Sequence, residues 1–210
     1  MNSKTLGDTR RLVGLALFTA IVVILQLLGS FIRFGPFSIS LVLVPIVVGA
    51  ALYGTAGGAW LGLVFGLVVI LQPDTAFFMN YSPLATVVVC LLKGALAGFC
   101  SGLVYRLLEK RNRYVAVLIA AIVCPLVNSG IFFLGCLLFF IPLIESTIAA
   151  PGEGVKFVLL FMIGGNFLFE MLFNILLSPV IVRLIRLGRR TQQLDMGSAS
   201  AESEGKEDQI

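Results

Sequence analysis

The sequence predicts an all-α membrane protein, a bundle of six transmembrane helices with both termini in the cytoplasm. Of its 210 residues, 59% are hydrophobic and 12% are charged, about half the charged share of an ordinary soluble domain. The apolar residues form long runs separated by segments rich in Gly, Pro and charge. With six crossings, 12 of the 15 Lys and Arg residues fall on one side of the bilayer, and the positive-inside rule makes that side the cytoplasm.

The six spans are expected at residues 12–32, 38–53, 56–71, 84–108, 114–141 and 156–190. The first run has no small-residue cleavage pattern, so we expect a retained span rather than a signal peptide. Pro45 is expected to kink the short second run. Gly54, Gly57 and Gly58 mark a turn into the third. Residues 1–11 then form a cytoplasmic segment, residues 12–190 the membrane domain, and residues 191–210 an acidic, Ser-rich tail that is expected to be disordered.

Several kinds of chemistry are not supported by the composition. The chain contains no histidine, which removes His-based metal sites, triads and proton relays. Its four cysteines lie inside apolar runs without C-x-x-C spacing and are expected to be buried thiols. No P-loop motif occurs, so the chain cannot hydrolyse ATP by that route. We therefore expect no catalytic residue, no metal and no cofactor.

Small residues recur at a spacing of four in or beside the first, third and fourth spans. The stripes comprise Ala16 and Ala20, then Gly54, Gly58, Gly62 and Gly66, and finally Gly94, Gly98 and Gly102. Such stripes let helix backbones approach closely in lipid. They predict either packing within this chain or docking onto another membrane subunit, and Ala16 with Ala20 is the best candidate for docking.

Polar residues gather in the last three spans: Lys93, Asn128, Asn166, Glu170 and Asn174. The last three are four residues apart, which places them on one helix face. A carboxylate at this depth costs about 3 kcal/mol or more unless it faces a partner or a wet cavity. Lys93 and Glu170 are able to pair across the bundle, so a purely structural ion pair stays open beside a ligand pocket. The segment 74–82, with Asn80, Phe77, Phe78 and Tyr81, is placed to cap such a pocket, although interfacial aromatics also serve as membrane anchors.

The ordered set Ala16-Leu-Phe-Thr-Ala20, residues 34–49, residues 53–62 and residues 92–98 resembles the S components of energy-coupling factor (ECF) transporters, which are their substrate-binding membrane subunits. The substrates of this family are vitamins. The resemblance implies that Ala16 and Ala20 dock on a transmembrane coupling subunit and that the vitamin binds near the outer face. Asn80, Lys93, Asn128, Asn166 and Glu170 fit the ligand site by position and chemistry.

The resemblance also implies two cytosolic ATPases as further partners, in the plasma membrane of a prokaryote. The pattern is most similar to the pantothenate branch, in which Lys93 or Arg33 would meet the carboxylate. Riboflavin or another small vitamin is the second choice. Two other classes stay open: a proton-coupled secondary carrier, and a non-transporting scaffold of a biogenesis or cell-shape complex.

Overall fold

A computed structural model describes the backbone of residues 3–29, 33–34, 37–38, 42–147, 153, 156 and 165–207. Side chains are described for residues 9, 11–29, 42–146, 153, 156, 167, 168 and 170–189. The elements are α1 (Ser3–Gly29), β1 (Arg33–Phe34), β2 (Phe37–Ser38), α2 (Leu43–Ile70), α3 (Pro73–Tyr81), α4 (Pro83–Leu108), α5 (Arg113–Gly135), the π-helix η1 (Cys136–Phe140), α6 (Ile141–Thr147) and α8 (Gly165–Glu207). The strands form a two-residue antiparallel pair.

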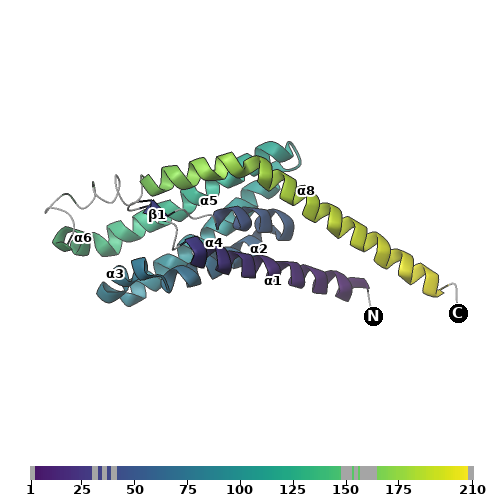
Figure 1. Cartoon of the computed structure of the whole chain (residues 1–210), viewed down its shortest axis with the longest axis horizontal. Coiled ribbons are helices and arrows are strands. Elements are labelled where there is room, and N and C mark those ends of the chain that lie inside the picture. Colours follow the sequence, from purple (N-terminus) through teal and green to yellow (C-terminus); the bar gives the residue numbers. More distant parts are fainter. Residues whose placement is uncertain are drawn as a thin grey trace.

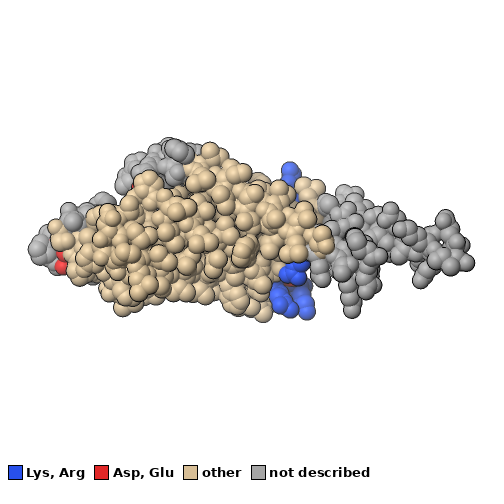
Figure 2. Space-filling model, turned by 90° about the horizontal axis from the view of Figure 1, so that it is seen from below, with Lys and Arg blue, Asp and Glu red and all other residues tan. Residues whose placement is uncertain are grey.

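The long helices pack in the order α1, α2, α4, α5 and α8. In Figure 1, α1 and α8 flank the other helices, and both chain ends lie toward the same end of the molecule. Figure 2 shows Lys and Arg gathered at one end of the body, with Asp and Glu at the other. We call the cationic end the basic end. There Arg11 of α1 and Arg186 and Arg189 of α8 contact α2, the start of α5 and the end of α4. The neighbouring cations on these helices and in the turn between α4 and α5 are Arg106, Lys110, Arg111, Arg113 and Arg183.

Helix α2 folds back on itself at Gly54. This glycine has φ 82° and ψ −177°, a conformation essentially reserved for glycine. Ala50, before Gly54, packs against Gly58, which follows it. In a straight helix, these two residues would be about 12 Å apart. The two halves of α2 are therefore antiparallel neighbours, and the second and third predicted spans are the two arms of this one element.

The second arm of α2 lies directly against α4 through glycine. A Cβ atom at Gly62 would overlap the carbonyl oxygen of Gly94, and one at Gly94 would overlap the carbonyl oxygen of Gly62. Gly58 and Gly98 have the same reciprocal relationship. The predicted glycine stripes therefore pack within this chain, where they bring two backbones into contact.

Arginines close the basic end of the bundle. The short first arm of α2 ends with free carbonyl groups, as every helix does. Arg11 of α1 donates to the Tyr53 carbonyl at 2.7 Å, and Arg189 of α8 donates to the Ala51 carbonyl at 3.4 Å. Arg189 also forms an ion pair with Glu109 at the end of α4. The two outer helices α1 and α8 are thus both bonded to the end of the first arm of α2.

The opposite end is closed by aromatic packing. Helix α3 begins at Pro73, a favourable first helical position, and Gln72 before it exchanges hydrogen bonds with Gln26 of α1 at 3.0 and 3.1 Å. Phe78 of α3 is buried against Phe132 of α5 and Phe140 of η1, with ring centroids 5.8 and 4.9 Å apart. Phe78 is thus part of a small core of its own rather than a free cap.

The structure refines the predicted boundaries. Five helices of the described chain are long and apolar enough to span a membrane, at Arg11–Gly29, Leu43–Ile70, Pro83–Leu108, Arg113–Ser146 and Glu170–Arg189. The expected loop after residue 141 is helical as far as Thr147, and the segment after Gln72 is helix α3. Most of residues 156–164, the start of the sixth predicted span, lies outside the described residues. Helical backbone continues to Glu207, whereas the sequence predicts disorder from residue 191; Figure 1 shows this part extending away from the bundle, and its disorder in solution stays a prediction.

The glycine contact gives a stability prediction. Gly62→Ala places a methyl group into the Gly94 backbone, and overpacking of this kind costs about 1–3 kcal/mol. We expect Gly62→Ala to lower the thermal unfolding midpoint of the purified protein in detergent.

Gly130→Ala is the matched control, because a Cβ atom at Gly130 meets nothing within 4 Å. Alanine is the better helix former by about 1 kcal/mol, so this variant should unfold at the wild-type temperature or above it. Equal stability of the two variants would contradict the backbone contact.

Candidate functional site

Lys93 lies on α4 between two aromatic rings. Its ammonium nitrogen is 4.9 Å from the Phe132 ring centroid and 5.9 Å from that of Phe65, both within cation–π range. The side chain is half-buried. Within the described residues, these two rings flank its ammonium group. The pairing of Lys93 with Glu170 stays a prediction.

Asn128 of α5 belongs to the same level of the bundle as Lys93. Ser101 of α4 donates to the Ala120 carbonyl of α5 at 3.2 Å, and the two helices run antiparallel. Lys93 lies eight residues before Ser101 on α4, and Asn128 lies eight residues after Ala120 on α5. Because the helices are antiparallel, the backbones of Lys93 and Asn128 lie at about the same height along the bundle axis. Asn128 is 6% exposed, and its Oδ1 has no hydrogen-bond donor among the described residues. Since a buried acceptor without a donor costs about 1–3 kcal/mol, this oxygen is poised to accept a hydrogen bond.

Helix α8 contributes Glu170 and Asn174, which are 2% and 1% exposed. Their spacing of four residues places both on the face that packs into the bundle, together with Ile181 and Ile185. Asn174 donates from Nδ2 to the Glu170 carbonyl at 2.8 Å, and its Oδ1 has no donor in the described part of the chain.

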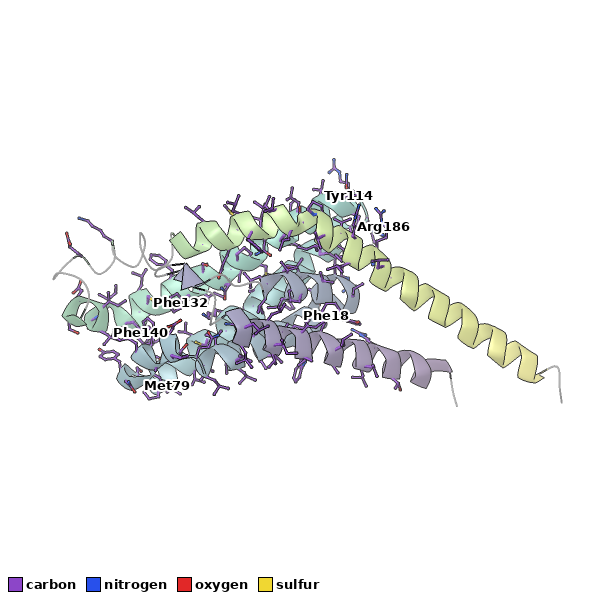
Figure 3. The ribbon with its side chains drawn as sticks, viewed as in Figure 1. Phe18, Met79, Tyr114, Phe132, Phe140 and Arg186 are labelled. Carbon is purple, nitrogen blue, oxygen red and sulfur yellow. The ribbon has the colours of Figure 1, made fainter. Side chains whose placement is uncertain are left out.

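A contact at the basic end sets the height of these two residues. Arg186 of α8 donates to the Tyr114 hydroxyl of α5 at 2.9 Å, and Figure 3 shows the two side chains together where α8 passes the start of α5. On α8, residue 172 lies fourteen residues before Arg186. On α5, Asn128 lies fourteen residues after Tyr114, so residue 172 and Asn128 are at about the same height. Glu170 and Asn174 therefore lie within about one helical turn of the Asn128 level. Three helices thus place polar groups at one level of an apolar bundle.

One predicted site residue, Asn80, lies away from this level, and the side chain of another falls outside the described residues. Asn80 is exposed on α3, whose neighbour Met79 lies at the end of the molecule opposite the chain ends in Figure 3. Asn166 is the second residue of α8, and its side chain lies outside the described residues, as does that of Arg33.

The predicted docking pair lies on an open surface. Ala16 and Ala20 are exposed on α1, next to Leu12, Leu17 and Ile24, which are 66%, 60% and 56% exposed. Contacts between the rest of α1 and α2 include the Arg11 bond described above, edge-to-face packing of Phe18 on Tyr53 with ring centroids 5.8 Å apart, and a hydrogen bond from Trp60 Nε1 to Thr19 Oγ1 at 3.1 Å. The alanines are therefore free to contact another membrane helix, in contrast to the buried glycines.

Sequence reasoning missed the aromatic partners of Lys93. Phe132 lies one turn beyond Asn128 on α5, on the same helix face. This Asn-x-x-x-Phe spacing, next to a span that contains Lys93, is the sequence pattern that could have predicted the contact. Asn174 was recognised on the polar face but left out of the site, although its orphaned Oδ1 is equivalent to that of Asn128. Phe65 gave no signal, because it is one of many apolar residues in its span.

Comparison with known proteins adds a family and a relative. Residues 10–182 match the family described as "ECF transporter, substrate-specific component". The chain is also 25% identical over 196 residues to the pantothenic acid transporter PanT of Lactococcus lactis subsp. cremoris, a match that covers 83% of this chain and 93% of the relative. The family match begins within α1 and ends within α8.

A substitution at Lys93 separates a binding role from a structural one. Lys93→Met keeps the side-chain volume and removes a charge from apolar surroundings, where a cation costs about 2.5–3.5 kcal/mol. If Lys93 serves a ligand, the ligand-free variant should unfold at the wild-type temperature or above it, because function and stability often oppose each other at binding sites.

Lys110→Met, at an exposed position of the basic end, is the control for the loss of one charge. A drop of several degrees in the unfolding midpoint of Lys93→Met alone would mean that the cation–π contacts hold the fold together.

Proposed function

Because the chain belongs to the substrate-specific components of ECF transporters, we propose that it captures a small vitamin outside the cell and delivers it to an ATP-driven importer. Pantothenate is the first-choice substrate, and riboflavin or another small vitamin is the second. The observation that carries the proposal is the family match over residues 10–182, and the pantothenic acid transporter among the relatives favours pantothenate.

The chemistry of the polar level suits pantothenate. This vitamin carries a carboxylate at one end and an amide and two hydroxyl groups toward the other. A carboxylate would give the Lys93 ammonium an opposite charge and a charge-assisted hydrogen bond, neither of which the two neutral rings supply. The orphaned Oδ1 of Asn128 would accept from an amide or hydroxyl group. Glu170, which lies near the same level, completes the proposed site as a further hydrogen-bonding group. We propose Asn166 and Asn80 as additional contacts, Asn80 from the exposed surface of α3.

The distribution of cations gives the proposed orientation. With the basic end in the cytoplasm, both termini are cytoplasmic and the aromatic end, which includes α3, faces outward. The chain would lie in the plasma membrane of a prokaryote, with a transmembrane coupling subunit and two cytosolic ATPases as partners. Ala16 and Ala20, exposed on α1, would form the contact with the coupling subunit.

Binding by the chain alone is the primary test. The purified protein, without partners, should be stabilised by pantothenate in a thermal-shift assay, by about 2.7 kcal/mol at a ligand concentration 100 times the Kd. Pantothenol, in which an alcohol replaces the carboxylate, should stabilise it far less, and Lys93→Met should remove the difference between the two ligands.

Riboflavin, thiamine and biotin form the comparison set in the same assay. Stabilisation by riboflavin instead of pantothenate would change the substrate but keep the role. If no vitamin shifted the unfolding of the wild-type chain, the assignment as a binding subunit would fail.

The docking surface is tested separately. Ala16→Trp with Ala20→Trp should leave pantothenate binding intact and abolish uptake by vesicles that contain the coupling subunit, both ATPases and ATP, because the bulky rings prevent close helix contact. Leu96→Trp, at a 40% exposed position of α4, is the control and should preserve uptake. Normal uptake by the double variant would refute docking through this pair, and uptake by vesicles that contain this chain alone would indicate a secondary carrier.

A further inference from the structure

The turn between α4 and α5 contains a hollow that the proposed function does not use. It has a volume of about 300 Å³ and is lined by Leu108, Arg111, Asn112 and Val115. Asn112 shapes it, because its side-chain oxygen accepts from the backbone nitrogens of Tyr114 and Val115 at 2.9 and 3.3 Å and so begins α5. The hollow therefore has two apolar walls and a cationic edge. Its volume is at the low end for small-molecule sites, which suits a headgroup rather than a large ligand.

The cations around this hollow have no counter-charge in the described chain. Arg106, Lys110, Arg111 and Arg113 are exposed, and no ion pair is recorded for them in the described residues. The nearby carboxylate, Glu109, is already paired with Arg189. An uncompensated cluster of this kind attracts an anion.

The surface beside the hollow is apolar and exposed. Leu107 on α4 and Val115 and Leu118 on α5 are 69%, 43% and 37% exposed, within helices long and apolar enough to span a membrane. Tyr114, which is 59% exposed, is of the residue type that favours the membrane–water boundary. The cationic edge thus lies where headgroups meet acyl chains.

We propose that this hollow binds the phosphate of one anionic phospholipid, such as phosphatidylglycerol. Arg111 pairs with the phosphate, Arg113 adds positive charge, and the acyl chains lie along Leu107 and Leu118. A lipid fits better than a protein partner, because the hollow is continuous with this exposed apolar surface and lies at the α4–α5 turn, whereas the proposed docking helix α1 packs on α2. This inference is independent of which vitamin the chain binds.

Lipid retention by the purified full chain tests the proposal. Native mass spectrometry would measure the binding of phosphatidylglycerol and of phosphatidylcholine with the same acyl chains. The wild type should retain one phosphatidylglycerol in preference to phosphatidylcholine. Each removed cation should weaken this binding about fivefold, so Arg111→Gln with Arg113→Gln should weaken it about twenty-fivefold.

Lys156→Gln is the control, because it removes one exposed cation outside the basic end and should leave the binding unchanged. Arg111→Gln alone should give the intermediate loss at an unchanged unfolding midpoint, since this side chain is exposed. Equal retention of the two lipids, wild-type retention by the double variant, or displacement of the lipid by millimolar glycerol phosphate would each overturn the lipid site. Unchanged lipid binding with weakened assembly onto the coupling subunit would assign the cations to a protein contact instead.

Discussion

The close contact between the backbones of α2 and α4 is the constraint on which the rest of the bundle depends. Lipid chains are as apolar as leucine, so helices in a membrane associate through close packing and not through burial from water. Gly62 and Gly94 meet with no room for a side chain on either, and Gly54 returns the chain so that both arms of α2 lie beside α4. Once α4 is held in this way, its other side is available to α5 and to the charged group at Lys93.

The polar level follows from how the neighbouring helices are held at their ends. Arg186 joins α8 to α5, and Arg189 joins α8 to α4 and to the first arm of α2. These contacts lie at the basic end, about 20 Å from the Asn128 level. Groups that are costly in lipid thus occupy the middle of a bundle whose helices are joined by polar contacts at the basic end and by the Ser101–Ala120 hydrogen bond between α4 and α5. Such an arrangement leaves Asn128 and Asn174 with acceptor atoms that a solute can use.

Much of this architecture is accessible from sequence alone, because single-chain patterns carry it. The spacing of four between Gly58, Gly62 and Gly66 predicts close packing, and the cations at the ends of the apolar runs predict the basic end. Heights across helices are not accessible in this way. Lys93 and Asn128 share a level only because Ser101 bonds to Ala120, which neither span reveals. Asn80 shows that suitable chemistry alone does not place a residue in a site, since its amide fits the ligand but its side chain is exposed on α3.

The central claim is that a vitamin occupies the level defined by Lys93 and Asn128. An experimental structure of the chain with bound pantothenate tests it most directly, through the distance from the Lys93 ammonium to the nearest ligand oxygen. The account predicts about 3 Å to a carboxylate oxygen, with the hydroxyl groups of the ligand directed toward Asn128. A ligand bound elsewhere, with Lys93 still between the rings of Phe65 and Phe132, would contradict it.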